Sequence, residues 1–135
     1  MIKKLSLSLI LGFIFCSMLM AQNPTLKLEV LYFHATRRCP TCMAIEENTK
    51  KTLDVYFASQ LKNGTIKFTV IDVDDSKSKA IAEKYEATGS ALFLTKTSGG
   101  KESRNDLTEF AFANARYNPD KFISVLKDKI NLLLK

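Results

Sequence analysis

The chain has 135 residues, of which 46% are hydrophobic and 25% charged, with three cysteines and a formal net charge of +6 at pH 7. This length corresponds to one domain with an ordinary hydrophobic core. Charges of both signs alternate along the chain, which is typical of a solvated surface, and no Lys/Arg stretch is interleaved with aromatic residues. The composition therefore argues against a nucleic-acid partner.

Residues 1–21 have the three parts of a secretory signal peptide. Residues 1–4 are basic, residues 5–20 are almost wholly apolar, and Ala21 is a small residue at the expected cleavage point. We therefore expect cleavage after about Ala21, export to the periplasm, and a mature domain of residues 22–135. The alternative is an uncleaved membrane anchor, because the apolar run is near the lower length for a span.

Strand and helix patterns alternate along the rest of the chain in the order β-α-β-α-β-β-α. We expect a mixed central sheet covered by helices on both faces, which is a three-layer α/β/α sandwich. The two early β-α-β passages predict parallel strands joined by right-handed crossovers, and the later hairpin adds an antiparallel edge. The expected strands are residues 26–33, 66–73, 91–94 and 101–104, and the expected helices are residues 40–62, a short helix near 80–85 closed by Gly89, residues 107–115, and a last helix from Pro119.

Two aromatic residues of the short segment 107–115 raise the question of a partner surface. Phe110 and Phe112 cannot both lie on one side of a helix. We expect both to pack against the edge of the sheet, and the alternative is that one is exposed at a surface for a partner.

A Cys-x-x-Cys motif lies between the first strand and the first long helix. Cys39 is expected near the helix N-terminus, where free backbone N–H groups and the helix dipole stabilise a thiolate. Arg37 and Arg38 add positive charge, so we expect the pKa of Cys39 below about 8.5, the value of a free thiol. Cys42 follows one turn later and could resolve a mixed disulfide.

Three interpretations of this pair remain open, and we favour redox exchange over a static disulfide or binding of a metal such as copper(I). Met43 could be a soft metal ligand, although a methionine here is more often part of the core. Covalent haem is excluded because Met43 stands where Cys-x-x-Cys-His needs histidine. His34 could take a proton from Cys39, but we favour a partly buried histidine bonded to the backbone.

These motifs resemble the thioredoxin family. Residues 32–35 with Cys39, Pro40, Thr41 and Cys42 are similar to its strand and active-site motif. Its second helix, third strand and hairpin resemble residues 81–85, 92–94 and 98–101. The similarity covers residues 26–135, and within it residues 32–50 and 106–122 look closest to an exported group labelled nitrophenyl compound nitroreductase subunit ArsF.

The resemblance implies a thiol-disulfide oxidoreductase without a cofactor or a metal. Its partners would be protein thiols or disulfides, with a membrane redox protein as a further candidate, and we expect a monomer. The alternative function is a non-catalytic module that binds a partner or handles copper. Cys39 and Cys42 would be catalytic, and the supporting residues would be His34, Arg38, Pro40, Thr41 and Ala91.

The chain departs from that family at four places, one of which is the loop from the first strand to Cys39, longer by one residue. Thioredoxins carry a cis-proline where this chain has Ser90 or Ala91, and we expect a trans peptide because a cis bond without proline costs about 3 kcal/mol. Arg38 replaces the aromatic residue before the first cysteine. The buried acid of the first strand has no match in residues 31–33, so proton handling at Cys42 needs another group or water.

Overall fold

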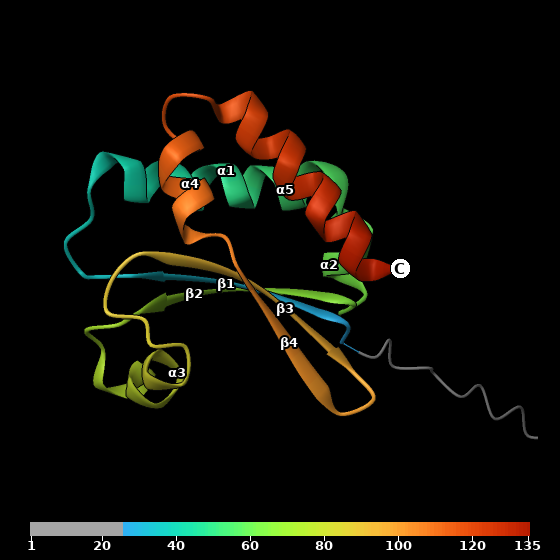
Figure 1. Ribbon diagram of the computed structural model, residues 1–135, viewed down its shortest axis with the longest axis horizontal. Coiled ribbons are helices and arrows are strands. Elements are labelled where there is room, and N and C mark those ends of the chain that lie inside the picture. The colour runs from blue at the N-terminus through green and yellow to red at the C-terminus, as the bar shows by residue number, and fades with distance from the viewer. Residues whose placement is uncertain (1–25) are drawn as a thin grey trace, which may run out of the picture.

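The computed structural model describes residues 26–135 (Figure 1). The predicted signal peptide lies outside the described residues. Among the helices of residues 26–135, none has the length and apolar character needed to cross a membrane.

Four strands form one mixed sheet in the order β2-β1-β3-β4. β1 is parallel to β2 and antiparallel to β3, and β4 is antiparallel to β3. Helices α1, α4 and α5 cover one face and α3 covers the other (Figure 1), so the expected three-layer α/β/α architecture is confirmed. The elements are β1 Leu28–His34, α1 Pro40–Tyr56, α2 Ala58–Lys62, β2 Ile66–Asp72, the 3₁₀ turn η1 Ser76–Ser78, α3 Lys79–Lys84, β3 Ala91–Ser98, β4 Lys101–Asp106, α4 Thr108–Asn114 and α5 Pro119–Leu134.

β1 is buried on both faces, and its residues 30–33 form the continuous apolar run that is typical of such a strand. Val30 and Tyr32 point into the larger core, which they share with α1, α4 and α5. Leu31 and Phe33 point into a smaller core beneath α3. Each large apolar side chain that is fully buried contributes about 1.5–3 kcal/mol, so this central strand fixes both layers.

The prediction that the second β-α-β passage joins parallel strands is wrong. His34 pairs with Asp72 at the end of β2, and the preceding residue, Phe33, pairs with Ala91 at the start of β3. The connection from β2 to β3 therefore begins and ends at the same end of the strands. α3 has six residues and is about 9 Å long, whereas the seven residues of β2 span roughly 23 Å. The short helix cannot carry the chain back along the sheet, and β3 runs antiparallel.

The helix expected over residues 40–62 is interrupted at Phe57. The backbone of Phe57 has φ −132° and ψ 23°, outside the helical region, and its side chain is only 2% exposed. We attribute the break to the burial of this ring in the larger core. Tyr56, the last residue of α1, is 49% exposed.

The short helix α3 ends at Lys84, and the turn that closes it is formed at Glu86 and not at Gly89, which corrects the second expected helix boundary. Glu86 has φ 53°, the left-handed conformation that usually requires glycine. The amide of Ala87 donates to the carbonyl of Ala82 at 2.9 Å, and the Glu86 amide donates to Glu83 at 3.0 Å. These two bonds are a Schellman cap, and Ala87 packs against the smaller core, a contact that often accompanies such caps.

The two aromatic residues of α4 have different environments, contrary to the expectation that both are packed. Phe110 stacks on Phe122 with ring centroids 5.7 Å apart. Phe112 is 40% exposed, because Ala111 and Asn114 occupy the buried side of the helix.

Candidate functional site

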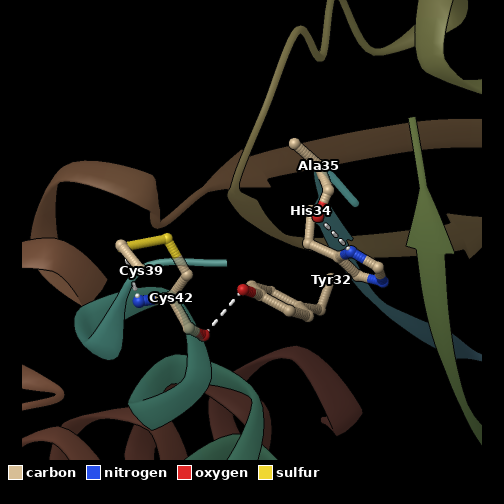
Figure 2. Close-up of a disulfide and its surroundings, with 5 residues drawn as sticks. All are labelled: Tyr32, His34, Ala35, Cys39 and Cys42. Carbon is tan, nitrogen blue, oxygen red and sulfur yellow. Dashed lines mark hydrogen bonds between the residues drawn. A yellow bond between two sulfur atoms is a disulfide. The ribbon is translucent and has the colours of Figure 1, made fainter. Parts of the chain in front are cut away.

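Cys39 and Cys42 form a disulfide at the N-terminus of α1, with their Cα atoms 5.0 Å apart (Figure 2). Cys39 is the N-cap residue, and Pro40 takes the first helical turn, where its missing N–H costs nothing. The amide of Cys42 donates to Cys39 Sγ at 3.0 Å. Cys39 is exposed, whereas Cys42 is only 8% exposed, so an incoming thiolate can reach one sulfur far more easily than the other.

The loop that carries Cys39 is attached to the carboxyl end of β2. The amide of Thr36 donates to Asp74 Oδ2 at 2.9 Å, and its hydroxyl donates to Asp72 Oδ2 at 3.0 Å. The Asp74 backbone N–H holds the pKa of the Asp72 carboxyl below its ordinary value, and the Thr36 hydroxyl adds to this effect. Two strand ends therefore position the loop between His34 and Cys39.

Tyr32 lies directly beneath the second cysteine. Its side chain is fully buried, and its hydroxyl donates to the Cys42 carbonyl oxygen at 2.7 Å (Figure 2). Burial raises the pKa of Tyr32, while a hydrogen bond from Ser90 and the charge of Arg38 lower it and the charge of Glu46 raises it. Ser90 therefore contacts the phenol that is hydrogen-bonded to Cys42, and the charges of Arg38 and Glu46 also act on it.

His34 makes the backbone hydrogen bond that we expected. Its ring is 7% exposed, and Nδ1 lies 2.8 Å from the Ala35 carbonyl oxygen. Because a carbonyl can only accept, Nδ1 carries the proton, and Nε2 is left to accept a hydrogen bond from Arg38 Nη2 at 2.6 Å. Figure 2 shows the His34 ring on the far side of Tyr32 from the disulfide.

Arg38 forms an ion pair with Glu46 through its other terminal nitrogen, Nη1. Both side chains are partly buried, with 29% and 28% of their surfaces exposed. The sequence suggested that Arg37 and Arg38 would both add positive charge beside Cys39. The pairing with Glu46 changes the contribution of Arg38, because a carboxylate now accompanies its guanidinium.

No protein-family model and no curated protein matches this chain. Solved structures that are similar to it include mitochondrial thioredoxin 3 from Saccharomyces cerevisiae in its oxidized form, at 23% identity over 78% of this chain and 81% of that chain, with a TM-score of 0.47. Thioredoxin from Trypanosoma brucei brucei is 20% identical over 83% of this chain and 96% of that chain, with a TM-score of 0.43.

The fold is thioredoxin-like. The mixed sheet, the helices on both faces and the cysteine pair at the start of α1 carry this assignment, because they are the features of that fold which the structure contains.

Ser90 and Ala91 occupy the position at which this thioredoxin-like fold would otherwise have a cis-proline. Residues 26–135 contain no cis peptide bond, so the bond before Ala91 is trans, as expected. A hollow of about 360 Å³ lies beside this segment and is also lined by Asp106 and Thr108. Neither cysteine lines this hollow, so it is separate from the cysteine pair.

Thr41 and Met43, which flank Cys42 in the chain, differ in exposure. Thr41 is half-buried between the cysteines. Met43 is 50% exposed, which corrects the expectation that it belongs to the core. Within residues 26–135, no group of three or more His, Cys, Asp and Glu side chains is placed to hold a metal ion.

Sequence reasoning missed Tyr32 and Glu46 as members of the site. Tyr32 and His34 lie two residues apart on the same face of β1, and a buried tyrosine hydroxyl usually finds a hydrogen-bond partner. That pattern could have indicated a polar contact beneath the cysteines. Glu46 lies one helical turn after Cys42, a spacing that predicts a shared helix face.

Proposed function

We propose that this protein carries out thiol-disulfide exchange through Cys39 and Cys42. The observation that carries the proposal is the asymmetry of the disulfide at the start of α1, where Cys39 is exposed and Cys42 is buried. The free N–H groups and dipole of a helix N-terminus stabilise a thiolate at the N-cap position, which is where Cys39 lies.

In the reducing direction, the Cys39 thiolate attacks a sulfur of a protein disulfide, and the other sulfur leaves as a thiolate and takes a proton from water. Cys42 then loses its proton, attacks Cys39 Sγ and releases the second substrate thiolate. Two electrons pass from the cysteine pair to the substrate, and the Cys39–Cys42 disulfide forms. The same steps in reverse oxidise a substrate dithiol.

The supporting roles follow from the contacts around the pair. Pro40 starts the helix, Thr41 spaces the two sulfurs, and Ala91 belongs to the segment that faces Tyr32 through Ser90. We assign His34 and Arg38 to the fixation of the loop before Cys39, because they are hydrogen-bonded to each other.

The proposal also includes the location of the protein and the kind of substrate on which it acts. The predicted signal peptide and the resemblance to the exported ArsF group support a periplasmic location, where protein thiols can form and keep disulfides. Protein thiols or disulfides would be the substrates, and a membrane redox protein would regenerate the pair. We propose no nitro-reducing activity.

A copper(I)-handling function is the second candidate, favoured by the exposed thioether of Met43 directly after Cys42. Competition of the reduced protein against a copper(I) chelator tests it, and the absence of tight binding would remove this candidate.

Replacing the resolving thiol tests the proposed exchange. Reduced Cys42→Ser should accumulate a mixed disulfide with a protein disulfide substrate, because nothing remains to displace the substrate from Cys39. Cys39→Ser is the matched control and should form at most about a tenth as much adduct, since the Cys42 sulfur is buried. Non-reducing electrophoresis with mass spectrometry measures the adduct. Equal trapping by both variants, or by neither, contradicts the proposal.

A further inference from the structure

We infer that the ion pair of Glu46 with Arg38 sets the redox balance of Cys39 and Cys42, with Glu46 as the positioning residue that opposes the positive charge of Arg38. The inference rests on the proposed thiol-disulfide exchange. It changes the expectation from the sequence, in which Arg38 acts on Cys39 without an opposing charge.

The helix geometry places Glu46 beside the redox pair. Glu46 is four residues after Cys42, so the two side chains lie on the same face of α1. Side chains of a helix lean toward its N-terminus, and the Glu46 carboxylate reaches Arg38, which precedes the N-cap Cys39. Its carboxylate must therefore extend back along the face that carries Cys42.

The guanidinium of Arg38 is fixed from two sides. Nη1 contacts Glu46 Oε2, and Nη2 contacts His34 Nε2 at 2.6 Å. His34 is itself fixed, because its Nδ1–H donates to the Ala35 carbonyl. Arg38 is consequently held between β1 and α1.

Tyr32 connects these charges to the cysteines. Its hydroxyl contacts the Cys42 carbonyl oxygen at 2.7 Å, and the charges of both Arg38 and Glu46 act on the same phenol. Arg38 and Glu46, which lies one helical turn after Cys42, therefore act on the phenol that is hydrogen-bonded to the Cys42 backbone. The charged and titratable groups around Glu46 are Tyr32 and His34 from β1, Arg38 from the loop, and Cys42 and Lys50 along α1, where Lys50 is paired with Asp54.

Electrostatics determines the sign of the effect. A carboxylate beside a thiolate disfavours the thiolate, and a guanidinium favours it. When the two are paired, their effects on the cysteines largely cancel. Without Glu46, Arg38 would stabilise the thiolate and hence the reduced pair, which makes the disulfide a stronger oxidant. Without Arg38, the carboxylate would make the pair a stronger reductant.

The equilibrium of the Cys39–Cys42 couple with glutathione at pH 7 tests this inference in four variants, each compared with the original protein. Glu46→Gln should shift the equilibrium constant about tenfold toward the reduced pair, which is about 30 mV for a two-electron couple. Arg38→Gln should shift it in the opposite direction, and the double variant should return close to the original value. Glu46→Asp keeps a carboxylate at this position, so its equilibrium constant should remain close to that of the original protein.

Glu47→Gln is the matched control, because Glu47 is an exposed neighbour on the same helix and the substitution removes the same charge. Its equilibrium constant should change less than twofold. Equal shifts in Glu46→Gln and Glu47→Gln would overturn the inference, and so would a Glu46→Gln protein that loses stability with an unchanged equilibrium constant. The glutathione equilibrium can be measured even when Cys42→Ser traps no protein substrate. Failure of the proposed function is therefore distinguishable from failure of this inference.

Discussion

Two buried tyrosines, one on each face of the sheet, have similar surroundings but different positions relative to the cysteines. Tyr85, beneath α3, contacts Thr95 Oγ1 at 2.8 Å and Glu102 at 3.2 Å, and the guanidinium of Arg104 lies over its ring. Tyr32 on the other face contacts the Cys42 carbonyl and has its own carboxylate and guanidinium nearby.

The residues around Tyr85 and those around Tyr32 form two clusters, which differ in what the tyrosine hydroxyl contacts. The Tyr85 cluster joins α3 to β3 and β4, and its ionic groups Lys84, Glu102 and Arg104 are exposed. Exposed ion pairs contribute little to stability. The Tyr32 cluster ends at the turn that carries the disulfide. The Tyr85 cluster therefore joins α3 to the sheet, whereas the Tyr32 cluster, with similar chemistry, supports the candidate site.

Removing each hydroxyl should separate the two roles. Tyr32→Phe and Tyr85→Phe should each lower the free energy of unfolding by about 1 kcal/mol, because each loses a buried hydrogen bond. Only Tyr32→Phe should also change the rate of exchange with glutathione, by about threefold or more. Urea unfolding and stopped-flow kinetics measure the two quantities. An equal kinetic effect of both substitutions would remove the distinction between the clusters.

A smaller effect is expected from pH, because each region has an acid with a lowered pKa. The Asp74 backbone N–H lowers the pKa of Asp72, and the Lys84 hydrogen bond lowers the pKa of Glu102. An acid of lowered pKa stabilises the fold above its unfolded value, about 4, and this contribution is lost as the pH falls through the folded pKa. In Asp72→Asn and in Glu102→Gln, the free energy of unfolding should fall less steeply as the pH drops below about 4. Urea titrations at a series of pH values measure it.

The same pH series distinguishes the two regions. Asp72 bonds the loop before Cys39, so Asp72→Asn should also alter glutathione exchange, whereas Glu102→Gln should leave it unchanged. A steeper acid loss in either variant would show that its carboxylate does not stabilise the fold.

The parts of the fold that local sequence determines were predictable. The apolar run of residues 30–33 indicated a strand, which is β1. The expected hairpin is also present, and its paired glycines have φ 57° at Gly99 and 77° at Gly100. Cys39 followed by Pro40 indicated the start of α1. Each of these signals depends on residues that are adjacent in the chain.

The features that were missed depend on contacts between distant residues. The direction of β3 follows from the short reach of α3, and periodicity reports burial but not strand direction. Glu86 takes a left-handed conformation that its residue type disfavours. The pairing of Arg38 with Glu46 is a choice of partner among many charges, which the sequence alone does not specify.

The central claim is that Cys39 is the exchanging sulfur and Cys42 the protected one. A short pulse of iodoacetamide on the reduced protein at pH 7, followed by peptide mapping, tests it most directly. The exposure of Cys39 and the burial of Cys42 predict that Cys39 is alkylated at least about tenfold faster. Equal rates at the two cysteines, or faster alkylation of Cys42, would contradict the account.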